Sequence, residues 1–215
     1  MPFSHIKSII SKRIFEARAL LKTCASDDVD NSAKRAIRGH IYVTLYGMYE
    51  CTVAHCVATA VDIANNHNIA HVSLKNGIHL FALQPHLNSY RDIGKDKTWA
   101  RGLLLLEWVH STDSANMENV FPSDGSFMRP SQLRLIWELF DLSGDPWPYP
   151  KLIGRIHELV ESRNHIAHGT EAAGQRGGMI SDGDMNDRIN DIEALCIHIV
   201  ETFSAELTSI AAFER

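Results

Sequence analysis

The chain has 215 residues, 45% of them apolar, a formal net charge of -5 and a pI near 6.2. A chain of this length and composition can bury a sizeable core, so we expect residues 1–215 to form a single domain. The acidic balance argues against a surface that binds nucleic-acid duplexes without regard to sequence, because such binding neutralises many phosphates. An enzyme that touches a few phosphates needs only a local cationic pocket, so that class stays open.

Cysteine usage indicates a reducing compartment, and the distribution of charge argues against a membrane-spanning or signal segment. The four cysteines lie in apolar, helix-like stretches without a CxxC pair, which favours reduced thiols over a disulfide framework or a zinc site. The longest uncharged apolar run, 102–106, is far too short to cross a bilayer, and charged residues interrupt the N-terminal segment at helical spacing. We therefore expect a cytoplasmic protein that has no membrane partner. The cysteines are Cys24, Cys51, Cys56 and Cys196.

Two helices are predicted in the first third of the chain. Apolar residues recur at three- and four-residue spacings from Phe3 to Leu21, which is typical of an amphipathic helix. The polar turn 26–31 ends it. A second, proline-free helix follows from about Ser32 to about Asn65, with apolar or small residues on several faces, so we expect it to be central.

Residues 66–129 are predicted to form a less regular insertion. A weakly helical segment from Leu74 to Leu83 is followed by Pro85 and a polar run. Residues 101–110 fit either a short helix or a buried strand, because a run of four leucines has no decisive period. Residues 111–129 are rich in Ser, Asp, Asn, Gly and Pro and are predicted to be a loop.

Helices are again predicted after residue 129. Pro130 and Ser131 open one that Gly144 can close in a left-handed cap, and a proline-rich connector follows at 145–150. The next helix runs from Lys151 to His168.

Gly169 stands where that helix needs a C-terminal cap, and a glycine-rich loop extends from it to Gly178. A last long helix begins between residues 182 and 187 and carries apolar residues as far as Ile210. The predicted fold class is all-α.

The helix at 151–168 ends on the sequence Arg-Asn-His-Ile-Ala-His, with Arg163 first and His168 last. Cleaving RNA without a metal requires the 2′-hydroxyl to lose a proton, the departing 5′-oxygen to gain one, and the charge on phosphorus to be held. Histidine titrates near neutral pH and can transfer protons. Arginine stays charged and grips phosphate oxygens through its planar fork. Both residue types therefore suit this chemistry.

The position of the two residues adds to this interpretation. The C-terminus of a helix carries partial negative charge and favours a protonated His168. Asn164 lies four residues before His168 on the same face and can orient the imidazole or contact substrate. Arg163 is about 140° away from His168 around the helix, so the two side chains of one chain do not share a face. A second copy of the motif, from a partner chain, would bring the two groups together.

The motif resembles the arginine-x4-histidine motif of the HEPN superfamily, with the asparagine often found after its arginine. The helix bearing Tyr42–Glu50 is similar to the second helix of the MAE-like bacterial HEPN branch, in which a tyrosine-rich stretch ends in glutamate. The helix from Pro130 to Gly144 and the Leu159-Val160 pair before the motif fit the same arrangement, so the resemblance covers roughly 6–210.

The resemblance implies an antiparallel helical bundle, a face-to-face homodimer with paired motifs, and RNA cleavage without a metal or cofactor. It also implies a toxin-antitoxin or phage-defence setting, with RNA as the substrate and an antitoxin or defence-system protein as a further partner. Glu50 then becomes a supporting carboxylate, and His165 a second supporting residue within the motif.

Simpler interpretations apply to the same residues. Arg163 could form a surface ion pair while His168 caps helix carbonyls. His165 and His168 have a spacing that can bind a metal from a helix, but no further ligands are evident. Glu50 could be a half-buried carboxylate satisfied by an arginine.

Two further spacings also permit a metal site. Cys51 and His55, four residues apart, are more simply explained by packing in a core. Acidic and amide residues between Asp182 and Glu193 echo a calcium loop, but Asp187 stands where that loop demands glycine, and acids at a helix N-terminus are the simpler explanation.

We therefore predict a metal-independent endoribonuclease of the toxin or phage-defence type. His168 transfers protons, Arg163 stabilises the phosphate, and Asn164 orients one of them. The expected products are a 2′,3′-cyclic phosphate and a 5′-hydroxyl. The alternative is a non-catalytic module that binds RNA, nucleotide or a partner protein, as an antitoxin does, or a purely structural dimer.

Overall fold

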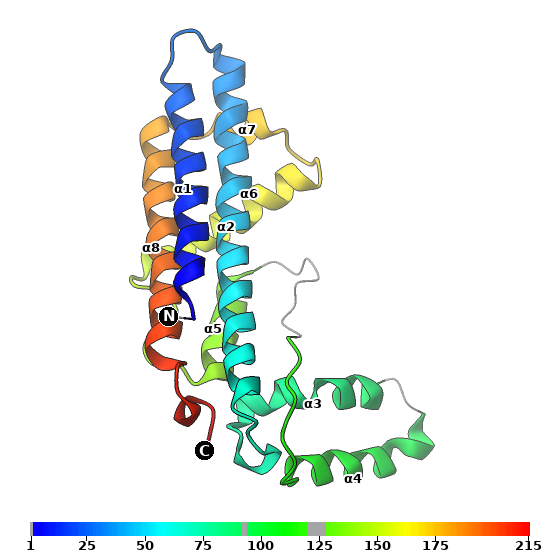
Figure 1. The fold of residues 1–215 in the computed structure, drawn as a ribbon. Helices are drawn as coiled ribbons and strands as arrows, with labels where there is room; N and C mark the ends of the chain where they lie inside the picture. Colours follow the sequence, from blue (N-terminus) through cyan, green and yellow to red (C-terminus); the bar gives the residue numbers. More distant parts are fainter. Residues whose placement is uncertain (1, 92–93, 120–127) are drawn as a thin grey trace.

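The longest helix of the computed structural model passes through the middle of the bundle (Figure 1). This helix, α2 (Asn31–Asn66), has 36 residues and is therefore about 54 Å long. It begins where the Asp30 carboxylate accepts hydrogen bonds from the backbone N–H groups of Ser32 and Ala33. Buried side chains lie on several of its faces, which confirms the prediction of a central helix.

The structure describes residues 2–91, 94–119 and 128–215, and within these ranges the chain is all-α, as predicted. The other helices are α1 (Ser4–Cys24), α3 (Asn76–Arg91), α4 (Thr98–Val109), α5 (Pro130–Phe140), α6 (Lys151–Ala167), α7 (Ala173–Gly177) and α8 (Asp182–Glu206). The same ranges also contain three short 3-10 helices: η1 (His71–Ser73), η2 (Lys95–Lys97) and η3 (Ile210–Ala212).

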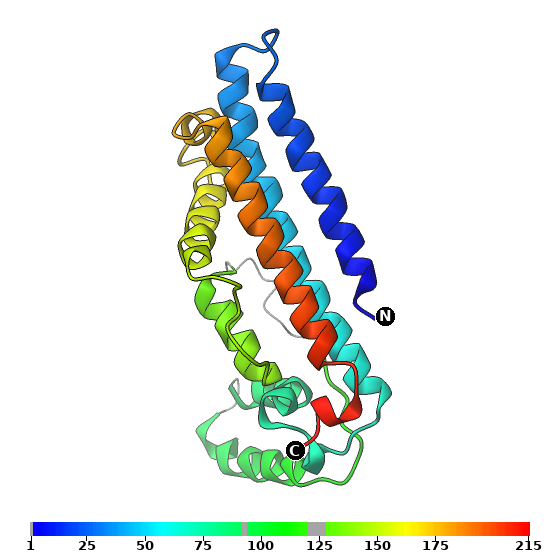
Figure 2. The same cartoon turned by 90° about the vertical axis from the view of Figure 1, so that its left-hand side faces the viewer.

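Helices α1, α2 and α8 pack against one another along their length, and α6 lies against both α2 and α8 (Figures 1 and 2). Helix α5 continues below α6 on the same side of the bundle. One apolar core joins these elements, because each turns an apolar stripe inward. Its largest fully buried side chains are Phe3, Tyr46, Tyr49, Phe140, Phe203 and Phe213.

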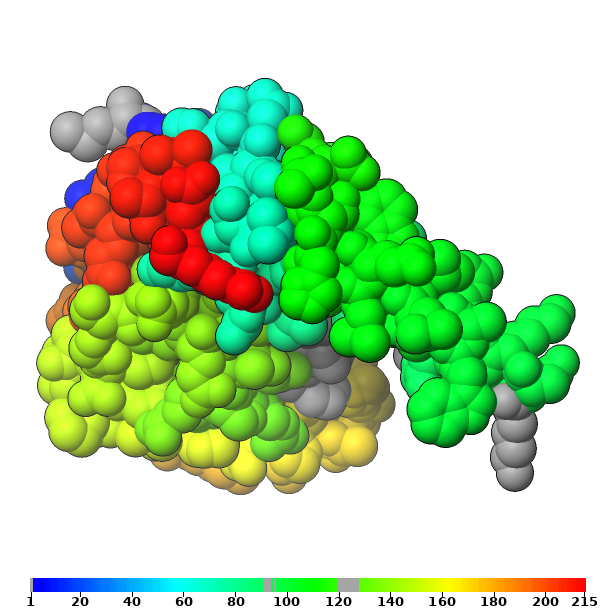
Figure 3. Space-filling model, turned by 90° about the horizontal axis from the view of Figure 1, so that it is seen from below, coloured from blue at the N-terminus to red at the C-terminus, as the bar shows by residue number. Residues whose placement is uncertain are grey.

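The insertion is more regular than predicted, because α3 and α4 form an arm that projects from one end of the bundle (Figure 3). Helix α3 continues through Pro85, which has no N–H to donate to the carbonyl of Phe81. The N–H of Glu118 donates to that carbonyl instead, at 3.2 Å, so the proline leaves no unpaired group there. Residues 120–127 of the predicted loop lie outside the described residues.

Helix α4 corrects the alternative of a buried strand at 101–110. It is a helix with no buried residue, and Trp99 is 85% exposed. A buried histidine pair holds the base of the arm: Nδ1 of His71 lies 2.9 Å from Nε2 of His79, and each residue is 3% exposed. The ring of His71 also packs against Trp108 of α4.

Three other boundaries differ from the prediction. Helix α5 ends at Phe140, and Asp141, with a φ of 53°, is its left-handed cap in place of Gly144. The N–H of Leu142 donates to the carbonyl of Trp137 and closes this cap, a position that aspartate tolerates. The glycine-rich loop contains the short helix α7, and α8 ends at Glu206, which leaves Ile210 in η3.

Helix α7 lies backbone to backbone against α2, and two glycines permit this approach. A Cβ atom at Gly39 of α2 would overlap the carbonyl oxygen of Ala173, and one at Gly177 would overlap the carbonyl oxygen of Arg35. The guanidinium of Arg38 reinforces the contact by donating to the carbonyl of Gly177 at 2.8 Å. The chain after the motif is thus held on α2.

Gly39→Ala and Gly47→Ala test this close approach, because both glycines lie in α2 but only Gly39 faces α7. Gly39→Ala should lower the free energy of unfolding by about 1–3 kcal/mol, since the added methyl group forces the two backbones apart. Gly47 has no neighbouring atom within 4 Å of the added Cβ, so Gly47→Ala should raise it by about 0.5–1 kcal/mol. Urea unfolding measures both. Equal effects would contradict the proposed contact.

Candidate functional site

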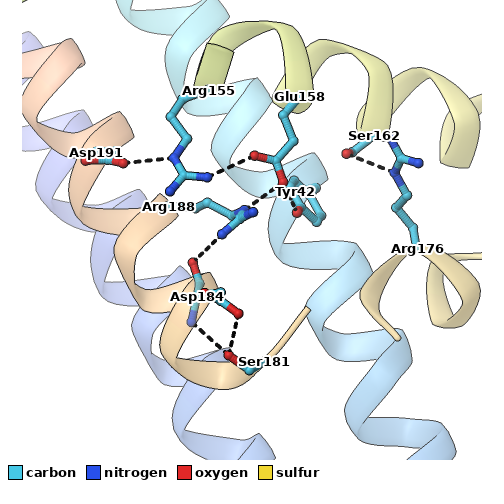
Figure 4. Close-up of polar contacts among 9 residues, drawn as sticks. All are labelled: Tyr42, Arg155, Glu158, Ser162, Arg176, Ser181, Asp184, Arg188 and Asp191. Carbon is cyan, nitrogen blue, oxygen red and sulfur yellow. Dashed lines mark hydrogen bonds and ion pairs between the residues drawn. The ribbon is translucent and has the colours of Figure 1, made fainter. Parts of the chain in front are cut away.

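Helix α6 carries the motif, and Glu158 fixes it to the two helices beside it (Figure 4). The Glu158 carboxylate accepts hydrogen bonds from the hydroxyl of Tyr42 on α2 and from Nε of Arg188 on α8, both at 2.7 Å. Nη1 of Arg155, one turn earlier in α6, donates to its other oxygen at 3.2 Å. Burial alone would raise the pKa of Glu158, but the hydrogen bonds from Arg188 and Tyr42 outweigh it and lower the pKa.

A second carboxylate, Asp191 of α8, holds the start of α6. It is 4% exposed and accepts from Nε of Arg155 and from the hydroxyl of Tyr149, both at 3.0 Å, and Nζ of Lys151 lies 2.8 Å away. Burial would raise the pKa of Asp191, and these partners, Lys151 first, lower it instead. The two carboxylates therefore stay ionised and place α6 at fixed positions along α2 and α8 (Figure 4).

Arg163 reaches back over α2 at the motif end of α6. Its guanidinium carbon lies 4.9 Å from the centre of the Tyr46 ring, a cation–π geometry. Nη1 also donates to Oδ1 of Asn164 at 3.2 Å, so the amide of Asn164 contacts the arginine. The hydroxyl of Tyr46 donates to Glu50 at 3.0 Å. Arg163, Asn164, Tyr46 and Glu50 thus form one group between α6 and α2, in which Tyr46 is buried and the other three are half-buried.

His168 lies at the C-cap of α6, where its N–H donates to the carbonyl of Asn164 at 2.9 Å. Gly169 follows with a φ of +68°, which confirms the predicted left-handed cap. The residue His168 is exposed at this helix end.

His165 faces the segment that follows the motif. Nδ1 of its imidazole is 3.1 Å from Oγ1 of Thr170 and 3.5 Å from Oε1 of Glu171. The other oxygen of Glu171 is 3.4 Å from Nη1 of Arg176 in α7, and Nε of Arg176 donates to the fully buried hydroxyl of Ser162 at 3.1 Å. Polar contacts thus link His165 to Ser162 through Glu171 and Arg176, and Figure 4 shows the last of them, between Arg176 and Ser162.

This arrangement separates two kinds of group around one helix end. The guanidinium of Arg163 is half-buried on the α2 side, whereas the imidazoles of His165 and His168 reach solvent. Arginine can hold a phosphate, and imidazoles can exchange protons with it. Such a set of groups is suited to phosphodiester chemistry or to the binding of a phosphate.

A family model described as MAE_28990-like HEPN matches residues 4–210 of the chain. The chain belongs to the HEPN superfamily. No curated protein and no solved structure matches it. HEPN membership and the all-α bundle are thus both established, and the family indicates a nuclease or another RNA-related function.

The alternative metal sites are not assembled within the described part of this HEPN chain, where no three His, Cys, Asp or Glu side chains come close enough to hold a metal ion. Asp182 pairs with Arg38 at 2.7 Å, and Asp184 forms hydrogen bonds with the N-cap residue Ser181. Both acids therefore act at the start of α8. The ring of His55 packs edge-on against that of His5.

No cysteine is in a disulfide, and no described helix is long and apolar enough to span a bilayer.

Four residues that the sequence reasoning did not single out belong to this site. Tyr46 lies beneath Arg163, Glu158 anchors α6, and Glu171 and Arg176 flank His165. Glu171 and Arg176 are the only charged residues of the glycine-rich segment 169–178, which was a signal available in the sequence. The periodicity of the sequence could not assign Tyr46 or Glu158 to this site, because their partners come from other helices.

The anchoring of α6 predicts a pH dependence for wild type and Glu158→Gln. The pKa of Glu158 is lower in the folded chain than its ordinary value of 4.5, so its contribution is complete above that pH and is lost as the pH falls below it. At pH 7 the variant should be less stable by about 1–3 kcal/mol, because Arg188 and Arg155 lose an ionised acceptor. The difference should shrink toward pH 3 in urea unfolding experiments.

Burial lowers the pKa of His79 to about 4, so both proteins lose stability as the pH falls below 6.5. This loss is the same in the wild type and the variant and cancels from the difference between them. A difference that stays constant from pH 7 to pH 3 would contradict an ionised, hydrogen-bonded Glu158.

Proposed function

We propose that this HEPN protein is a metal-independent endoribonuclease of the toxin or phage-defence type that acts as a homodimer in the cytoplasm. His168 transfers a proton, Arg163 holds the phosphate, and Asn164 orients the guanidinium through the contact at 3.2 Å. Glu50 supports the arginine through Tyr46. An antitoxin or defence-system protein would restrain the activity.

The observation that carries the proposal is the grouping of Arg163 and His168 at one exposed helix end in a chain of the HEPN superfamily. The pair supplies what the reaction needs: a fixed cation for the charge that develops on the phosphate, and an imidazole that can transfer a proton. The half-buried guanidinium is held by the Tyr46 ring, which limits the freedom that phosphate binding would otherwise remove.

The homodimer is part of the proposal because of helix geometry. Arg163 and His168 point about 140° apart around α6, with the arginine toward α2 and the imidazole toward solvent. A second copy that packs its motif against the first would place the arginine of one chain beside the histidine of the other. Such an isologous contact creates two equivalent sites.

Cleavage of total RNA in EDTA by the purified protein tests the activity. The wild type should yield fragments with 2′,3′-cyclic phosphate and 5′-hydroxyl ends, and Arg163→Ala and His168→Ala should each be at least about 100-fold slower. His157→Ala, at an exposed histidine of the same helix, is the matched control and should cleave as the wild type does. Expression of the wild type and the control should be toxic to cells.

A wild type that binds RNA without cutting it would support the alternative, a non-catalytic binding module. Cleavage that EDTA abolishes would instead contradict the metal-independent mechanism.

Co-expression of Arg163→Ala and His168→Ala chains with different tags tests the shared site. A heterodimer purified through both tags holds one complete set when the arginine and the histidine act from different chains, so it should recover about half of the wild-type rate. Each variant purified alone should remain inactive. A heterodimer as inactive as its parents would show that the two groups do not combine across chains.

A further inference from the structure

A carboxylate and an arginine outside the motif converge on His165. The chain reverses at Gly169, and the N–H of Glu171 then donates to the carbonyl of His165 at 3.2 Å. This reversal places the Glu171 carboxylate beside Nδ1 of the imidazole, at 3.5 Å. The carboxylate is mostly shielded, since its side chain is 20% exposed, whereas that of His165 is 42% exposed.

The contacts of Thr170 assign the tautomer of His165. The Thr170 hydroxyl donates its single hydrogen to the carbonyl of His165 at 3.1 Å, so its oxygen is left to accept from Nδ1, also at 3.1 Å. The Glu171 carboxylate next to Nδ1 can only accept as well. Nδ1 therefore carries a hydrogen, and in the neutral imidazole it is Nε2 that presents the lone pair.

Arg176 holds this arrangement in place. It joins the Glu171 carboxylate to the buried hydroxyl of Ser162, and it belongs to α7, which the Gly39–Gly177 approach locks onto α2. One oxygen of the Glu171 carboxylate thus faces the imidazole, and the other faces the Arg176 guanidinium, whose Nε is held by the hydroxyl of Ser162. This is the order of contacts by which a carboxylate orients a histidine that accepts protons.

We propose that His165 is a second catalytic residue, the general base of the RNA cleavage proposed above, and that Glu171, held by Arg176, is its positioning residue. His168 is then the general acid. The two histidines are three residues apart, so they lie on neighbouring positions of one helix face and can reach the two ends of a single phosphodiester. The inference rests on the proposed function and assigns its two proton transfers to different residues.

The proton transfers balance as follows. Nε2 of His165 takes the proton of the 2′-hydroxyl as the 2′-oxygen forms a bond to phosphorus. The bond from phosphorus to the 5′-oxygen breaks, and that oxygen takes the proton of His168. The products are the 2′,3′-cyclic phosphate and the 5′-hydroxyl, and exchange with water returns both imidazoles to their starting states.

Chemical rescue by imidazole separates the two roles. His165→Ala and His168→Ala should each lower kcat about 100-fold or more in EDTA. Added imidazoles of different pKa should restore part of both rates. The rate constant for rescue of His165→Ala by the neutral form should increase with the pKa of the added imidazole, because that form accepts a proton. The rate constant for rescue of His168→Ala by the protonated form should decrease with that pKa, because that form donates a proton.

Glu171→Gln tests the positioning role and should lower kcat about 10-fold while KM stays near that of the wild type. A merely structural loss would change KM and the melting temperature as well. His157→Ala is again the matched control, and His165→Gln provides a second variant if His165→Ala does not fold.

A wild type that cleaves RNA while His165→Ala keeps its full rate would overturn this inference and leave the proposed function intact. Rescue rate constants that change in the same direction with the pKa of the added imidazole in both variants would overturn the division of roles. A wild type that cleaves no RNA would overturn both proposals together.

Discussion

The close approach of α7 to α2 determines the geometry of the motif end. Gly39 and Gly177 have no side chains to hold the two backbones apart, so a helix of only five residues lies directly on the central helix. A helix this short has little stability of its own and depends on such packing. Because α7 is held there, Arg176 can extend back to α6 and join Ser162 to Glu171.

The motif helix itself is positioned by charge inside an otherwise apolar bundle. Asp191 is buried and Glu158 is partly buried, and such carboxylates are tolerated because hydroxyl and guanidinium donors surround them. Contacts of this kind have narrow geometry, whereas apolar packing tolerates small slides along a helix. The anchoring of α6 on both α2 and α8 therefore keeps the last turn, with its arginine and histidines, in a constant orientation.

Periodicity predicted most of the bundle. The long helices α1, α2, α6 and α8 repeat apolar residues at helical spacing, and the cap at Gly169 is recognisable because its chemistry is local. The prediction failed where a distant segment changes the local preference. Helix α3 continues through Pro85 because Glu118 pairs the carbonyl that the proline leaves open, and no window of sequence contains both residues.

The sequence alone determined the residue types at the motif, their place at a helix end, and the resemblance that the family match confirmed, since these depend on neighbours a few positions apart. Only the tertiary structure decided which side chains meet them. Tyr46 lies under Arg163, and Arg176 reaches Glu171 beside His165, because α2 and α7 pack against α6. Contacts between helices depend on packing geometry, which no local pattern encodes.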